Sequence, residues 1–244
     1  MHSIFGTKHL IILAISLAAM VLGVIFARKW PMKKLAKTML NIGLVSEFIK
    51  VFYYIMANEA THGGILPKTD LPFHLCSIQI IFIVILNLSA NERLRRILLS
   101  FMVPSCLLGG AAAILIPTSS ALNSPVITVQ YFLFHIALMV LALRIATSDE
   151  IRLTVKDYFG CLKFLVGLFF FATYINSLVY DGVSNINFMY VASPPQSGLP
   201  YLTEEHGWLV YVIHYAFLVV LCVTLCYLKP IVTAIRSRSK RNKK

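Results

Sequence analysis

The stretch HLIILAISLAAMVLGVIFA at residues 9–27, followed by RKWPMKK at residues 28–34, decides the fold of this chain. A helix needs about 20 mostly apolar residues to cross the hydrocarbon core of a bilayer, and this stretch is that long. A secretory signal has a shorter apolar region, and its basic residues precede that region instead of following it. The stretch therefore predicts a retained first transmembrane helix.

Apolar segments of similar length recur along the whole chain. Of its 244 residues, 58% are hydrophobic and only 13% are charged, against about 25% charged residues in soluble domains. The segments lack the alternation of lipid-facing barrel strands, so the sequence predicts an all-α, polytopic membrane protein with a single domain, residues 1–244. The predicted spans are about 8–27, 38–57, 72–90, 96–116, 127–145, 159–180 and 207–228.

Lys and Arg residues mark alternate connections between these spans. They occur in the first, third and fifth links and in the tail, whereas the second link has only Lys68 and the fourth and sixth have none. The positive-inside rule then predicts a seven-helix bundle with its N-terminus outside and its C-terminus in the cytoplasm, which we expect in the plasma membrane. The basic residues concerned are Arg28, Lys29, Lys33, Lys34, Lys37, Arg93, Arg95, Arg96, Arg144, Arg152 and Lys156, then Arg236, Arg238, Lys240, Arg241, Lys243 and Lys244.

The net charge of +12 does not indicate a nucleic-acid-binding protein, because the charges form short clusters between apolar segments. Topology alone explains the basic tail, and a second interpretation is that the tail also contacts anionic headgroups. The five cysteines fall in or beside apolar segments, so a secreted-type disulfide framework is not expected.

Polar groups inside the predicted spans are the candidates for chemistry, because burying them in a membrane is costly. Cys76, at the outer end of the third predicted span, is a candidate nucleophile if a base reaches it, or else a small packing residue. His135 lies in the outer half of the fifth, where it is a candidate base or a structural hydrogen-bonding group. Their similar depth makes a Cys/His pair geometrically feasible.

Further polar groups lie in the second and seventh predicted spans. Glu47 and Lys50 are three residues apart, so they form a structural ion pair or a site for substrate or headgroup. His206 and His214 lie on roughly one side of a helix, and His214 is a candidate for facing the same cavity. The chain has no His-Glu-x-x-His, phosphate-binding loop or Gly-x-Ser-x-Gly motif, and neither a metal site nor a cofactor is predicted.

Several motifs resemble, in order, those of the bacterial YwaF-like integral membrane proteins. They are Phe5-Gly6-Thr7-Lys8-His9-Leu10, Leu71-Pro72-Phe73-His74-Leu75-Cys76, Phe132-Leu133-Phe134-His135, and Asn185-Ile186-Asn187-Phe188-Met189-Tyr190 followed by Pro194-Pro195. The family is similar to an animal multi-spanning acyltransferase that acts on ether lysophospholipids through a cysteine. Phe188 departs from the family pattern, in which tyrosine is more usual, and leaves the aromatic character intact.

The resemblance implies an enzyme that transfers or hydrolyses the acyl chain of a phospholipid or lysophospholipid. Cys76 matches the nucleophile and His135 the base, and Asn187, Tyr190 and His74 are expected oxyanion donors or substrate contacts. The alternative is a non-enzymatic transporter or sensor in which Glu47, Lys50 and the histidines line a pathway for lipid or solute. The expected partner is a membrane lipid, and the sequence leaves the oligomeric state open.

Overall fold

The computed structural model describes residues 6–57, 65–122, 124–195 and 202–241, and all regular structure in these ranges is helical. The α-helices are α1 (Thr7–Ala27), α2 (Met32–Ala57), α4 (Ile78–Leu88), α5 (Glu92–Leu115), α6 (Pro125–Thr147), α7 (Val155–Val179), α8 (Trp208–Cys226) and α9 (Leu228–Arg241). Short 3-10 helices are η1 (Lys68–Asp70), η2 (Ser119–Leu122) and η3 (Phe188–Tyr190). Within the described ranges, 6 helices, namely α1, α2, α5, α6, α7 and α8, are long and apolar enough to cross a membrane. The prediction of an all-helical, multi-pass membrane protein is confirmed at that level.

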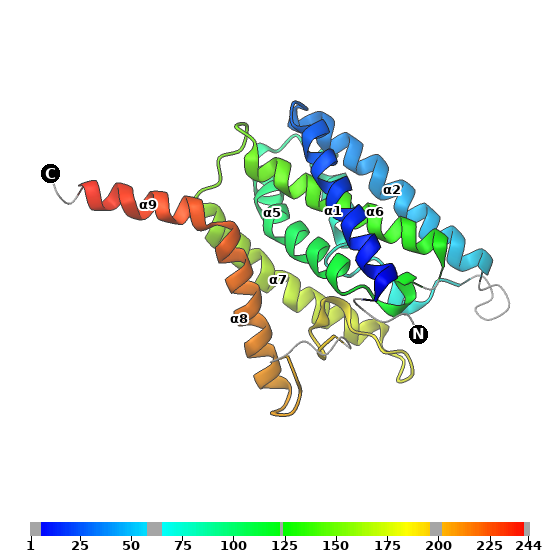
Figure 1. Ribbon diagram of the computed structural model, residues 1–244. Coiled ribbons are helices and arrows are strands. Elements are labelled where there is room, and N and C mark those ends of the chain that lie inside the picture. The colour runs from blue at the N-terminus through cyan, green and yellow to red at the C-terminus, as the bar shows by residue number, and fades with distance from the viewer. Residues whose placement is uncertain (1–5, 58–64, 123, 196–201, 242–244) are drawn as a thin grey trace.

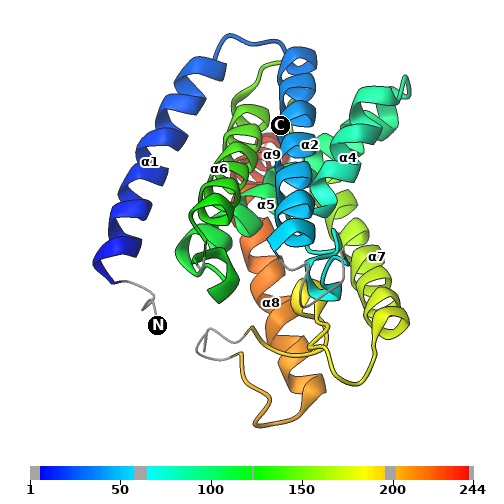
Figure 2. The same ribbon diagram turned by 90° about the vertical axis from the view of Figure 1, so that its right-hand side faces the viewer.

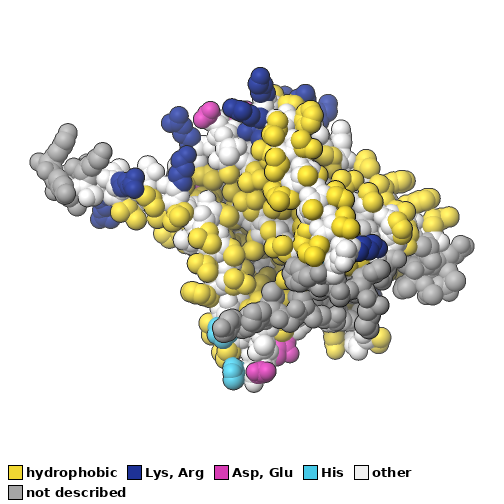
Figure 3. Space-filling view, viewed as in Figure 1, with side chains coloured by type: hydrophobic (Ala, Val, Ile, Leu, Met, Phe, Trp, Pro, Cys, Tyr) yellow, Lys and Arg dark blue, Asp and Glu magenta, His cyan; other side chains and the backbone are white. Residues whose placement is uncertain are grey.

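The helix pair α5 and α6 forms the centre of the bundle. Helices α1 and α2 pack on α6, whereas α7 and α8 pack on α5, so the two pairs flank the centre on opposite sides (Figure 1). Met102 of α5 and Leu138 and Leu141 of α6 are fully buried there. Large apolar side chains cover the visible outer face of the bundle (Figure 3), as expected for a protein whose surrounding solvent is hydrocarbon.

The basic links lie together at one end of the bundle, which we call the basic end. The Arg144 guanidinium donates hydrogen bonds to the carbonyls of Ala27 and Trp30, 2.7 and 3.4 Å away, so the end of α6 adjoins the α1–α2 link. Arg96 pairs with Asp157 at 2.7 Å, so the start of α5 adjoins the start of α7. Lys and Arg side chains line this edge in Figure 3. The opposite end carries η1, η2 and η3, and we call it the loop end.

The predicted span at 72–90 differs from what the structure shows. Only residues 78–88 are helical, and residues 71–77 form turns that close with bonds such as Phe73 N–H to Leu71 O at 2.8 Å. Pro72 keeps Leu71 out of the helical region, but a proline can begin a helix, so nothing in the sequence explains why α4 begins only at Ile78. The 11 residues of α4 are about 16 Å long, too short to cross a bilayer unaided.

Candidate functional site

The turns at 71–77 bring the Cys76 side chain against the middle of the bundle. A Cβ atom at position 109 of α5 would lie 2.7 Å from the Cys76 Sγ, a distance that real Cβ atoms essentially never show. Glycine at 109 therefore makes the room that the thiol occupies. Cys76 is partly buried and packs against the apolar core. A thiolate is costly in such surroundings, so the thiol needs a base at the moment it reacts.

His135 of α6 lies beside the next residue of α5. A Cβ at Gly110 would lie 3.1 Å from the His135 carbonyl oxygen. The His135 Nδ1 is 2.7 Å from the carbonyl oxygen of Tyr131, which can only accept a hydrogen bond. A neutral His135 therefore carries its proton on Nδ1, and its Nε2 presents a lone pair. That tautomer is the one a general base requires.

Tyr131 connects the two candidates. Its ring centroid is 4.3 Å from that of His135, and its hydroxyl donates to the Ala113 carbonyl of α5 at 3.3 Å. Tyr131 also interacts electrostatically with Cys76. The Cys76 thiol and the His135 backbone thus lie against consecutive glycines of α5, and the Tyr131 ring packs against the His135 imidazole. No hydrogen bond joins the thiol to the imidazole in the part of the chain that the structure describes.

His74 lies under the loop that carries η3. Its ring centroid is 5.1 Å from that of Phe188 and 6.0 Å from that of Tyr190. The backbone of Thr69 hydrogen-bonds the imidazole. Tyr190 in turn interacts with Cys76, and burial first and that thiol second raise the pKa of the Tyr190 phenol. Tyr190 therefore keeps its proton and remains a hydrogen-bond donor next to the cysteine.

The η3 turn has an unusual backbone. Met189 and Tyr190 have φ values of 56° and 53°, so two consecutive non-glycine residues occupy the left-handed region. Such conformations persist only where the surroundings fix them, and they cluster at functional sites. The Asn187 amide nitrogen donates to the Ser193 carbonyl and hydroxyl oxygens at 2.8 and 2.9 Å, and its oxygen accepts from Ala192 N–H. The Asn187 side chain is therefore committed to shaping this loop.

Side chains from α7 and α8 hold the same turn in place. Asn176, buried on α7, exchanges a pair of hydrogen bonds with the backbone of Phe188 at 2.8 and 3.2 Å. Tyr211 donates to the Tyr190 carbonyl, and Tyr215 donates to the Met189 carbonyl at 3.0 Å. Sequence reasoning missed these three residues. A buried asparagine in an apolar span and two tyrosines four residues apart were the available signals.

Glu47 and Lys50 form the ion pair that their spacing allows. The Lys50 Nζ lies 2.8 Å from Glu47 Oε1 and also donates to the Asp70 carbonyl at 2.9 Å, which ties α2 to η1. Burial raises the pKa of the Asp70 carboxyl, and Lys50 opposes that shift. His214, by contrast, is exposed on α8. It has no hydrogen bond or ring contact with Cys76 or His135 within the described residues.

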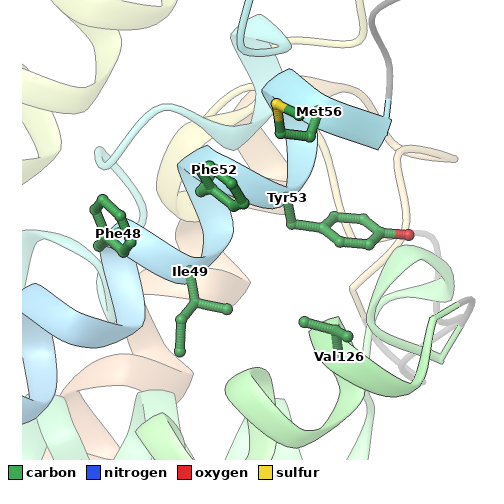
Figure 4. A pocket seen from close by; sticks show the side chains of 6 residues that line it. All are labelled: Phe48, Ile49, Phe52, Tyr53, Met56 and Val126. Atoms are coloured by element: carbon green, nitrogen blue, oxygen red, sulfur yellow. The ribbon is translucent and has the colours of Figure 1, made fainter.

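An apolar groove of about 410 Å³ opens sideways between α2 and α6 near the loop end (Figure 4). Its lining residues are Phe48, Ile49, Phe52, Tyr53, Met56 and Val126. Next to it, the Gln130 amide of α6 donates to the Ser46 hydroxyl of α2 at 2.6 Å. The helix that lines one side of the groove therefore also carries Tyr131 and His135 further along.

Comparison with known proteins identifies the family of this chain. No curated protein matches the chain, and no solved structure matches it. The model of the TMEM164 family matches residues 4–227, which include every helix of the bundle and every residue of the candidate site. The chain therefore belongs to the TMEM164 family of membrane proteins.

Proposed function

We propose that this chain is a membrane enzyme that transfers or hydrolyses the acyl chain of a phospholipid or lysophospholipid, with Cys76 as nucleophile and His135 as general base. The observation that carries the proposal is the pairing on α5: the thiol fits against Gly109, and the backbone of His135, whose imidazole has the required tautomer, lies beside Gly110. The motif resemblance supports the same roles.

The proposed reaction begins when the Cys76 Sγ attacks the ester carbonyl while its proton passes to His135 Nε2. The tetrahedral intermediate collapses, the C–O bond of the ester breaks, and the departing lysolipid oxygen takes that proton. A thioester on Cys76 remains. A lysolipid hydroxyl or water, deprotonated by His135, then attacks the thioester and restores the thiol. Substrate binding must bring the two side chains into hydrogen-bond reach, since the free protein has no such bond within its described residues.

The Tyr190 hydroxyl is the oxyanion donor that we assign. It interacts electrostatically with Cys76, and its raised pKa keeps it protonated. His74 packs against the same ring and supports its position. Both amide hydrogens of Asn187 are already used by Ser193, so we assign Asn187 to the loop and not to the oxyanion.

The test is acyl transfer by the full chain reconstituted in liposomes that contain a phospholipid and an isotope-labelled lysophospholipid. Labelled diacyl product and free fatty acid are measured together. We expect Cys76→Ala and His135→Gln each to lower turnover by at least about a hundredfold, and Cys76→Ser to leave a small residual rate.

Matched controls come from the same residue types. Cys222→Ala removes a partly exposed thiol of α8, and His9→Gln removes a buried histidine of α1. Both are expected to retain turnover. Activity that is indifferent to Cys76, with the variant folded, would reject the proposal in favour of a transporter or sensor. The Glu47–Lys50 pair gives that alternative little support, because its members already satisfy each other.

We further propose that the chain crosses the plasma membrane seven times, with the basic end in the cytoplasm and the N-terminus outside. Helix α2 runs toward the loop end and α4 returns toward the basic end (Figure 2), which supports a further crossing by the segment that contains α4. A tag before residue 1 should then be cleaved by protease added to intact cells, whereas a tag after Lys244 should be protected. Cleavage of the C-terminal tag would contradict this topology.

A further inference from the structure

Helix α9 leaves the bundle at a sharp corner. Figure 1 shows it running sideways from the end of α8, and Figure 2, turned by 90°, shows it nearly end-on while the spans run lengthwise. Pro230 lies in its first turn. Proline has no N–H with which to continue the hydrogen bonding of α8, and it is accepted in the first turn of a new helix. Tyr227 at the corner is fully buried and donates to the Ser100 carbonyl at 2.9 Å, so the direction of α9 is fixed by the core.

One side of α9 is apolar and largely uncovered by protein. Leu228, Ile231, Val232 and Ile235 follow the i, i+3, i+4, i+7 spacing of a single helical stripe. Leu228 and Ile235 are 51% and 63% exposed, and Ile231 is only partly buried, against the edge of the core. A stripe of this kind needs a nonpolar environment outside the protein.

Cations flank the stripe on both sides, and residues 228–241 contain no acidic residue. At 100° per residue, Lys229 and Arg236 lie next to Val232 on one edge, and Arg238 lies next to Ile231 on the other. All three cationic side chains are exposed. Figure 3 shows Lys and Arg on α9 continuing along the basic end of the bundle.

We propose that α9 lies flat on the membrane at the basic end and binds anionic phospholipid headgroups. The apolar stripe enters the boundary between headgroups and acyl chains, and the flanking cations reach the phosphates from both edges. The sharp corner at Tyr227 supports this placement, because a helix that turns aside from the spans at their end can lie along the membrane surface. The inference is independent of the proposed acyl chemistry.

The test is hydrogen exchange of the full chain in nanodiscs, read by mass spectrometry at residues 228–241. Discs of phosphatidylcholine alone are compared with discs that also contain phosphatidylglycerol. We expect slower exchange in the anionic discs than in the neutral ones. Each cation removed in the Lys229→Gln/Arg236→Gln variant should reduce that extra protection roughly fivefold. High salt should have the same effect.

A variant with equal charge loss at the same end is the control. Lys33→Gln/Lys37→Gln removes two exposed cations of α2 and should leave the exchange of α9 unchanged. Ile235→Asn should raise exchange in both kinds of disc, whereas Thr233→Asn on the polar side should not. Equal exchange with and without phosphatidylglycerol would overturn the proposal, as would protection that needs an added acidic protein or nucleic acid.

Discussion

Two adjacent glycines set the distances at the candidate site. Gly109 admits the Cys76 sulfur, and Gly110 admits the Met139 side chain and the backbone of His135. Small residues let transmembrane helices approach closely. Here Gly109 also accommodates the thiol of Cys76, so its substitution probes the site without replacing the proposed nucleophile or base.

We expect Gly109→Ala to lower the free energy of unfolding by about 1–3 kcal/mol, the usual cost of overpacking. The substitution should also reduce labelling of the Cys76 thiol and the rate of turnover. The new Cβ would lie 2.7 Å from the Cys76 sulfur, and the turns at 71–77 would have to shift. Differential scanning fluorimetry measures the stability, reaction with a thiol reagent measures the labelling, and the liposome assay measures the turnover.

The control is Gly167→Ala on α7, where a Cβ meets no atom within 4 Å. Alanine favours helix over glycine by about 1 kcal/mol, so this variant should be unchanged or slightly more stable. Equal stability of the Gly109 and Gly167 variants would contradict the close packing of Cys76 on α5.

At the scale of elements, the η3 turn depends on side chains from two other helices. Asn176 from α7 bonds the backbone of Phe188, and Tyr211 and Tyr215 from α8 donate to the carbonyls of the two left-handed residues. The turn in turn places Phe188 and Tyr190 over His74. Helices α7 and α8 therefore determine where the η3 residues lie over the candidate site.

Asn176→Ala should release the η3 turn, because it leaves the backbone N–H and carbonyl of Phe188 without partners at a cost of about 1–3 kcal/mol each. We expect faster hydrogen exchange at residues 187–193 and little change in α1 and α2. Ser177→Ala, which removes only a bond within α7, is the control. Unaltered exchange at 187–193 would show that the turn does not need Asn176.

The link from α7 to η3 begins with a turn that the Asp181 carboxylate holds in place. Asp181 accepts from the backbone N–H groups of Ser184 and Val183 at 2.7 and 3.0 Å and pairs with Lys68 at 3.1 Å. These bonds, first that from Ser184 and then that from Val183, hold the pKa of the Asp181 carboxyl below its usual range. A carboxyl whose folded pKa is depressed stabilises the fold above its unfolded pKa and loses that effect as the pH falls through the folded value.

Asp181→Ala should therefore speed proteolysis and hydrogen exchange of residues 181–195 throughout the neutral range. The wild-type chain should approach the behaviour of the variant only below about pH 4, where an unfolded aspartate becomes protonated. Mass spectrometry across a pH series distinguishes the two chains. If the wild-type link loosened between pH 8 and 5, another group would be responsible.

At the scale of the whole molecule, Arg144 joins the α1–α2 hairpin to the central pair. It is 7% exposed and donates to carbonyls at the end of α1, where a helix leaves carbonyl groups without partners. Glu150 accepts from the Met32 N–H at 3.2 Å, at the start of α2. The last turn of α6 and the link that follows it thus cap the two helices of the hairpin at the basic end.

Arg144→Gln should lower stability by roughly 1.5–3 kcal/mol for each charged hydrogen bond lost, with α1 the first helix to gain hydrogen exchange. Arg93→Gln removes an exposed cation at the same end and should have almost no effect. A loss of stability equal in the two variants would indicate that charge at the basic end, and not the contact with Ala27, is what matters.

Composition and segment length determine the class of this protein. The apolar spans predict helices because the membrane requires every backbone polar group to be satisfied within the segment, and that requirement can be read residue by residue. The Glu47–Lys50 pair was predictable for the same reason, since both residues lie on one helix three positions apart. The shared side of the basic links also followed from their alternation along the chain.

The tertiary structure alone decided what surrounds the candidate residues. Hydropathy did not distinguish a continuous third span from turns at 71–77 followed by a short helix, because both are apolar. The glycines beside Cys76 and His135 and the Asn176 and Tyr211 bonds to η3 all join different segments of the chain. Such contacts depend on how helices pack against one another, and a single sequence records the spacing within a helix but not the partner that each face meets.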